Sequence, residues 1–244
     1  MGWRDRRGRG AVNAYFTVDV EHDCPPYLTT WRGIEEGMPR LLAMLDEEQV
    51  HATCFTTGDL ARRYPETVRA IVDAGHELGC HGDTHRSFAE MTLPESEAEI
   101  RVASDTLRAF APVVSFRAPY LRFPAKYVAL LGRHQYALDS SEGRHKKLRA
   151  SVHRDHGVLR VPASVTSSTL RWPAFARHAL FSRLSDPVVL FVHPWEFVDL
   201  TREPLRFDCR FKTGDEALEC ARAALRFFKA RGATFRRMRD CAAA

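Results

Sequence analysis

The chain has 244 residues, of which 45% are hydrophobic and 27% are charged, and its formal net charge is +5 at pH 7. This length allows one large domain or two small ones around a sizeable core. The composition is that of a soluble globular protein, and the apolar runs are too short to cross a bilayer. No basic run is interleaved with aromatic residues on a recognisable module, so nucleic acid is not an expected partner.

The N-terminal stretch MGWRDRRGRG is basic, and neither the apolar segment nor the small-residue cleavage site of a secretory signal follows it. We therefore expect residues 1–12 to form a disordered basic tail and the protein to be cytoplasmic. A second interpretation is that the tail attracts an anionic membrane face or anionic lipid-linked sugars. The six cysteines include no Cys-x-x-Cys pair, so they indicate neither a zinc ribbon nor a redox dithiol, and we expect them to be mostly reduced.

From residue 13 onward, strand-like and helix-like segments alternate along the chain. The predicted strands cover residues 14–20, 51–58, 76–82, 113–120, 136–141, 157–164, 187–197 and 234–238. The predicted helices cover residues 34–50, 60–75, 94–110, 126–134 and 214–233. This alternation implies parallel β–α–β units, and about seven of them predict a single barrel-like α/β domain over residues 13–240. The less regular stretch 141–175 is predicted to hold loops that shape a binding groove.

Polar groups gather where the predicted strands end, which is where α/β barrels place their chemistry. These ends carry Asp19, Glu21, His22 and Asp23; His81, Asp83 and His85; Arg117 and Tyr120; Asp139; and His193, Trp195 and Glu196. Randomly placed polar residues would not concentrate so consistently at five strand ends. The pattern therefore predicts a functional site on this edge of the barrel.

His81 and His85 are four residues apart, and a tight loop around Gly82 would present both imidazoles to one point. Two imidazoles and one carboxylate make a site for zinc or another divalent metal, with positions left open for water or substrate. The acidic residues after the first strand, Glu21 and Asp23, are the candidate sources of the carboxylate. The alternative is that the two histidines are ordinary surface residues.

Five stretches in this order resemble the motifs of the NodB-type polysaccharide deacetylases, carbohydrate esterase family four. They are FTVDVEHD, HGDTH, FRAPY, LDSS and VLFVHPWEF, and the resemblance covers roughly residues 13–240. It implies a distorted (β/α) barrel of about seven parallel strands, of the NodB-homology type. It also implies a metal-dependent hydrolase that removes an N-acyl group, such as acetyl, from an amino sugar or sugar conjugate.

The resemblance also assigns roles to single residues. Asp19 matches the general base, Arg117 the residue that orients this base, and His193 the general acid. Glu21 matches the metal-binding carboxylate, although the family usually has Asp there. Asp23 stands two residues further on and could take its place.

Further matches concern the substrate and the supports of the site. Tyr120 matches the position whose backbone N–H holds the oxyanion, and Trp195 matches part of the apolar wall near the acetyl group. We expect Asp139 to orient His193 or only to end a strand, and Glu196 to be a hydrogen-bonding partner. Asp83 is expected to cap a turn or to hydrogen-bond a metal-binding histidine.

The resemblance implies a divalent metal ion, with zinc first and cobalt, nickel or manganese as alternatives. The implied substrate is an N-acylated amino sugar or glycoconjugate, and the expected cytoplasmic location favours a nucleotide-linked, lipid-linked or small soluble one. Two other hypotheses stay open: a hydrolase of cyclic amides or ureides similar to allantoinases, and an inactive sugar-binding homologue, which the Glu21 substitution allows. The sequence gives no oligomeric state.

Overall fold

The computed structural model describes residues 12–144 and 150–242, so all but the last residue of the predicted tail lies outside the described residues. Within these ranges the strands are β1 (Asn13–Val20), β2 (Thr53–Thr56), β3 (Glu77–Cys80), β4 (Ser115–Phe116), β5 (Leu138–Asp139), β6 (His153–Asp155), β7 (Val158–Arg160), β8 (Val188–Val192) and β9 (Thr234–Phe235). They form one sheet in the order β6-β7-β5-β4-β3-β2-β1-β8, and β9 pairs with the beginning of β1.

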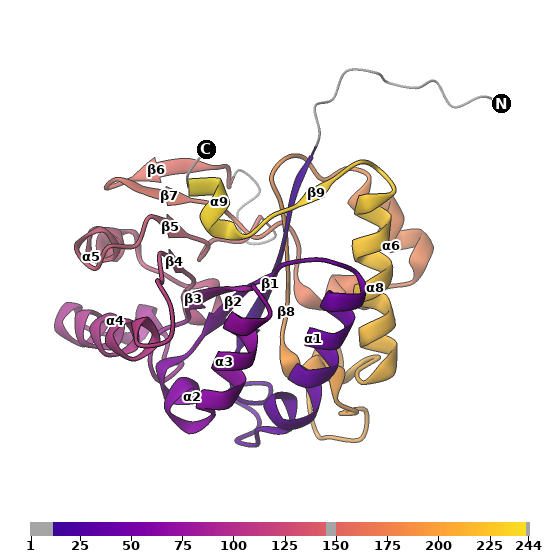
Figure 1. Cartoon of the computed structure of the whole chain (residues 1–244), viewed down its shortest axis with the longest axis horizontal. Helices are drawn as coiled ribbons and strands as arrows, with labels where there is room; N and C mark the ends of the chain where they lie inside the picture. Colours follow the sequence, from indigo (N-terminus) through magenta and orange to yellow (C-terminus); the bar gives the residue numbers. More distant parts are fainter. Residues whose placement is uncertain (1–11, 145–149, 243–244) are drawn as a thin grey trace.

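The pairing is parallel from β7 through to β8, and β6 joins β7 in antiparallel orientation. Helices lie around the outside of the curved sheet (Figure 1). The strand order among the described residues ends at β6 on one side and at β8 on the other, so the barrel is open. The predicted distorted (β/α) barrel with about seven parallel strands is thereby confirmed.

The helices are α1 (Met38–Glu47), α2 (Gly58–Arg63), α3 (Pro65–Asp73), α4 (Leu93–Arg108), α5 (Val128–Arg133), α6 (Ala174–Phe181), α7 (Phe207–Arg210), α8 (Asp215–Lys229) and α9 (Met238–Ala242). The single helix predicted over 60–75 is two helices, because Pro65 begins α3 and Tyr64 before it is not helical (φ −127°, ψ 61°). None of the described helices is long and apolar enough to span a membrane.

Except for β6 and β9, which are largely exposed, the strands bury both of their faces, and successive side chains point to opposite ones. On β1, Phe16 and Val18 belong to the main core, whereas Tyr15 belongs to a second apolar cluster that includes residues of β2, β5 and β8. Met238 of α9 joins this second cluster. The same alternation puts Thr17 and Asp19 on the face of Tyr15, so that polar groups follow the apolar cluster toward the carboxyl ends of the strands.

Glu77, the first residue of β3, holds the C-terminal helix α9 against the sheet. Its carboxylate accepts hydrogen bonds from the Thr53 hydroxyl (2.7 Å), the Ser115 hydroxyl (2.5 Å) and the backbone N–H of Arg239 in α9 (2.9 Å). Burial raises its pKa above the ordinary value for a glutamate. Glu77, the acidic residue of β3, therefore serves the scaffold.

Candidate metal centre and catalytic site

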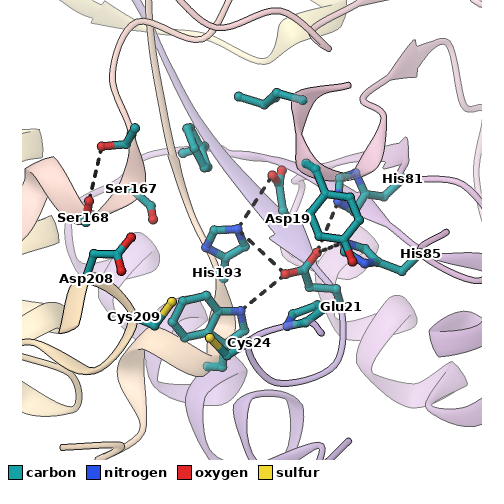
Figure 2. A pocket seen from close by; sticks show the side chains of 16 residues that line it. Asp19, Glu21, Cys24, His81, His85, Ser167, Ser168, His193, Asp208 and Cys209 are labelled. Carbon is teal, nitrogen blue, oxygen red and sulfur yellow. Dashed lines mark hydrogen bonds and ion pairs between the residues drawn. The ribbon is translucent and has the colours of Figure 1, made fainter. Parts of the chain in front are cut away.

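Glu21, His81 and His85 form a buried cluster beyond the carboxyl ends of β1 and β3. The Nε2 atoms of His85 and His81 lie 2.5 Å and 3.3 Å from Glu21 Oε2. One ligand atom from each residue lies within 4.8 Å of the other two. In Figure 2 the two imidazoles point at the Glu21 carboxylate from one side of the pocket. The structure thus brings together two predicted metal histidines and one predicted carboxylate.

The parallel register explains this convergence. β1 pairs with β2 and β2 with β3, so the residues that follow β1 and β3 emerge at the same edge of the sheet. After His81 the chain turns at Gly82, whose φ of +77° favours glycine, and His85 itself has a φ of +60°. A non-glycine residue in this conformation is strained, which is common where the surrounding structure holds a functional side chain in place.

Asp83 secures this loop from the side away from the metal cluster. It forms an ion pair with Arg62 of α2, with a distance of 2.7 Å between Nη1 and Oδ1. A Cβ atom at Gly58 would lie only 2.1 Å from the same oxygen, so glycine is required there. Asp83 was expected to cap a turn or to hydrogen-bond a metal-binding histidine. Its carboxylate instead joins the loop to the neighbouring helix α2.

The donor set fits a divalent cation. The Nδ1 of His81 lies 2.7 Å from the carbonyl oxygen of Arg117; since a carbonyl only accepts, Nδ1 carries the proton and the Nε2 lone pair faces Glu21. Burial alone would raise the pKa of Glu21, but His85, His193 and His81 together hold it well below the ordinary value. An ionised carboxylate beside two imidazoles is a typical zinc-binding set.

Asp23 is engaged elsewhere. Its carboxylate accepts hydrogen bonds from the Thr30 hydroxyl (2.6 Å) and from the backbone N–H groups of Arg32 (2.9 Å) and Gly33 (2.8 Å). These three donors lie at the beginning of the helical turn that precedes α1. Of the two candidate carboxylates, the structure places Glu21 with the histidines and uses Asp23 to fasten the loop.

Asp19 and Arg117 form a buried ion pair beside the cluster. Arg117 Nη1 donates to Asp19 Oδ1 and to the Thr17 hydroxyl, both at 2.7 Å, and Nη2 donates to the Ser140 hydroxyl at 3.0 Å. The guanidinium is fully buried and lies 4.3 Å from the ring centre of Phe55. One oxygen of Asp19 is thus fixed by arginine, and the other, Oδ2, faces His193 at 4.0 Å.

His193 lies across the pocket from the histidine pair. Its Nε2 is 3.8 Å from Glu21 Oε1, and its Nδ1 is 2.9 Å from Glu196 Oε1. Trp195 stacks on the imidazole with a centroid distance of 4.8 Å and an interplanar angle of 19°. Burial lowers the pKa of His193, but Glu21, Glu196 and Asp19 outweigh it and raise the pKa to about 9. An imidazolium is therefore favoured near neutral pH.

The expectation that Asp139 orients His193 is corrected by these contacts. Asp139 pairs with Arg160 (Nε to Oδ2, 2.8 Å) and accepts the hydroxyl of Ser141, which in turn accepts the backbone N–H of Ala118. Glu196 is the carboxylate that holds His193, because the turn after β8 folds residue 196 back onto residue 193. Glu196, three residues from His193 along the chain, therefore fills the role that was considered for Asp139 on β5.

Arg171 supports this arrangement and was not found by sequence reasoning. Its Nε lies 3.1 Å from Glu196 Oε2, and both side chains are 2% exposed. Its remaining nitrogens donate to the backbone carbonyls of Asp208, Cys209 and Phe211 in and after α7. Nothing in the local sequence SSTLRWP distinguishes this arginine from a solvent-exposed one.

The pocket around these groups has walls from several loops. Tyr120, with a φ of +60°, places its ring edge-on to His85 at 4.8 Å between centroids. Trp195 lies on another side and donates weakly from Nε1 to Glu21 Oε1 at 3.4 Å. Further lining residues that the motifs did not indicate are Cys24, Ser167, Ser168, Phe191, Asp208 and Cys209. Ser167 and Ser168 come from the stretch that was predicted to shape a groove.

An open α/β barrel with a candidate metal centre at the carboxyl ends of its strands is the class of protein that the fold and the site define. Residues 14–138 match the family described as polysaccharide deacetylase. The match spans half of the chain, and the protein belongs to this family.

Curated relatives and a solved structure agree with this assignment. A peptidoglycan deacetylase of Helicobacter pylori is 32% identical over 110 residues, which are 44% of this chain and 37% of the relative. A chitooligosaccharide deacetylase of Sinorhizobium fredii is 32% identical over 118 residues, 47% of this chain and 50% of the relative. The chain thus matches half or less of the length of these relatives. A family 4 carbohydrate esterase from Streptomyces lividans, in complex with acetate, shares the fold with a TM-score of 0.62, 18% identity and coverage of 92% and 91% of the two chains.

Proposed function

We propose that this protein is a metal-dependent hydrolase that removes the N-acetyl group of an amino sugar or sugar conjugate and releases acetate and a free amine. The observation that carries the proposal is the meeting of three units in one pocket: the Glu21–His81–His85 cluster, the Asp19–Arg117 pair and the Glu196-bound His193. The names of the two curated relatives, which act on peptidoglycan and on chitooligosaccharides, support an N-acetylated sugar as the substrate class.

Glu21, His81 and His85 would hold the cation, and zinc is our first choice because of the donor set, with cobalt, nickel or manganese as alternatives. A divalent ion bound there supplies Lewis acidity, which polarises the acetamide carbonyl and makes a water more acidic. The proton transfers and the positioning of the substrate are carried out by groups of the protein itself.

Asp19 accepts the proton of the attacking water, since Arg117 fixes one of its carboxylate oxygens and leaves the other facing the pocket. His193, as the imidazolium, donates a proton to the departing amine nitrogen. Glu196 holds the Nδ1 side of the ring, so that Nε2 faces the pocket. By the family resemblance, the backbone N–H of Tyr120 serves the oxyanion, and Trp195 forms the apolar wall beside the acetyl group.

The metal centre can be tested before any substrate is known. We expect purified protein to bind about one zinc per chain, and a chelator to lower its melting temperature until zinc is restored. The double variant His81→Ala/His85→Ala should lose this binding, and His153→Ala, at an exposed histidine of β6, should keep it. Protein that binds no metal, and that stays inactive after zinc or cobalt is added, would support the inactive sugar-binding alternative.

The substrate class can be tested by assaying acetylated chitooligosaccharides, peptidoglycan, nucleotide-linked N-acetylhexosamines and allantoin side by side. We expect acetate release from at least one of the sugars and no opening of the ureide. Hydrolysis of allantoin alone would replace this proposal by the cyclic-amide alternative. The cytoplasmic location stays a prediction, and cell fractionation would test it.

A further inference from the structure

Two cysteines from distant parts of the sequence meet in the wall of the pocket. Cys24 lies in the loop after β1 and is 2% exposed, and Cys209 belongs to α7 and is half-buried. Cys24 belongs to an apolar cluster against which Cys209 packs, and both residues line the pocket that holds the metal cluster. Figure 2 shows the two labelled cysteines and their sulfur atoms on the same side of the pocket.

The backbone on each side of this contact is held in place. The carbonyl of Cys24 accepts the N–H of Tyr27 at 3.0 Å, and Asp23 just before it is fastened by its three hydrogen bonds. Arg171 donates to the carbonyl of Cys209 at 3.4 Å and to that of Asp208 at 2.8 Å. The two thiols also pack with one apolar cluster, which contains Trp195, Val198, Leu200 and Leu205. The fold thus holds two thiols in contact by anchoring both of their segments.

We propose that Cys24 and Cys209 form a redox-active thiol pair, which low-molecular-weight disulfides oxidise to a reversible intramolecular disulfide in the pocket wall. This site is independent of the proposed hydrolase activity and of the identity of the metal. It would connect the loop that follows β1, and hence the segment after Glu21, to the α7 segment that carries Asp208.

Cys209 is the attacking thiol in this chemistry. The neighbouring Cys24 thiol lowers the pKa of Cys209 below the ordinary cysteine value, whereas Cys209 and burial raise the pKa of Cys24. A thiolate is the nucleophile in disulfide exchange, and Cys209 is also the more exposed of the two thiols.

The exchange with oxidised glutathione balances in two steps. The Cys209 thiolate attacks one sulfur of glutathione disulfide, forms a mixed disulfide and releases one glutathione thiolate. The Cys24 thiol loses its proton and attacks the Cys209 sulfur, which forms the Cys24–Cys209 bond and releases the second glutathione thiolate. Two protein thiols are oxidised, one glutathione disulfide is reduced, and the two released thiolates take up the two protons lost by the cysteines.

The test uses the folded full chain, equilibrated in buffers of increasing oxidised glutathione, then alkylated and digested without reduction for peptide mass spectrometry. We expect a linked pair of peptides that contain Cys24 and Cys209, which dithiothreitol separates again. The Cys24→Ser variant lacks the second thiol and should accumulate glutathione on Cys209, and Cys209→Ser should leave Cys24 unmodified. The control Cys220→Ser, at a half-buried cysteine of α8, should form the same link as the wild type.

A thermal readout tests whether the bond fits the native fold. The cross-link closes a long loop in the unfolded chain, so the oxidised protein should melt at a higher temperature than the reduced protein. Wild-type protein in which both cysteines stay open to alkylation, or which forms the link only in urea, would overturn the proposal. A lower melting temperature after oxidation would equally refute a native disulfide at this place.

Discussion

Replacing Arg171 with methionine tests whether the buried pair with Glu196 holds the acid side of the pocket. Methionine keeps much of the length and the apolar contacts of the side chain, but leaves the Glu196 carboxylate with His193 as its remaining cationic partner. Both partners are 2% exposed, so water can compensate little for the lost charge. Removing one partner of a buried pair typically costs about 3–5 kcal/mol of unfolding free energy. We expect a loss of about 4 kcal/mol for Arg171→Met, since the three carbonyls of the α7 segment also lose their donor.

The assay is urea denaturation followed by circular dichroism, with a double variant and a surface control. Arg171→Met/Glu196→Gln also removes the buried carboxylate that has lost its arginine, so it should be clearly more stable than Arg171→Met alone. Arg101→Met breaks an exposed pair with Asp105 (3.8 Å) on α4 and should cost about 0–0.5 kcal/mol. The reasoning fails if Arg171→Met stays within about 1 kcal/mol of the wild type, or if the double variant recovers nothing.

Three further predictions concern the base, the loop and a helix cap. Asp19→Asn should keep the metal and the fold but lower kcat by about 10²–10⁴-fold, measured by acetate release. Asp23→Asn should lower the unfolding free energy by about 1–3 kcal/mol in urea and leave zinc affinity, measured by calorimetry, nearly unchanged. The backbone N–H and the hydroxyl of Thr92, together with Arg86, lower the pKa of Glu95 from 4.5 to about 2. Its stabilisation is therefore present above pH 4.5 and lost as the pH falls toward about 2, so Glu95→Gln should flatten this part of the stability curve.

There is a physical reason why the sequence predicted the barrel and why several of the predicted site residues lie together in one pocket. In parallel β–α–β units the carboxyl ends of all strands meet on one edge, so polar residues that follow strands far apart in the sequence come together. Asp19, His81, Arg117 and His193 each follow this rule. The ion pair between Asp19 and Arg117 could also be expected, because a charged group buried on the barrel face is stable only when it is paired.

Other features depended on contacts that local patterns do not encode. Arg171 and Glu196 pair across two loops, and the cysteines Cys24 and Cys209 meet although no short spacing links them. Asp139 was expected to orient His193 or only to end a strand; it is the last residue of β5 and forms an ion pair with Arg160 of the adjacent strand β7. The choice among several partners for a buried charge depends on three-dimensional distances. Arg160 stands opposite Asp139 in the register of β5 and β7, whereas Arg171 and Glu196 come from turns far apart in the sequence.

The choice between Glu21 and Asp23 follows from where β1 ends. Along an extended strand, residues two apart share a face, so Glu21 continues the face of Asp19 toward the histidines as long as the chain stays extended. The strand ends at Val20, and at Cys24 the backbone has a φ of +41°. Between these points the chain turns, and the backbone N–H of Asp23 already bonds to the carbonyl of Thr30 at 2.9 Å. Glu21 therefore keeps the side-chain direction of the strand, and its side chain is long enough to reach both imidazoles. The side-chain direction of Asp23 is set by the loop instead.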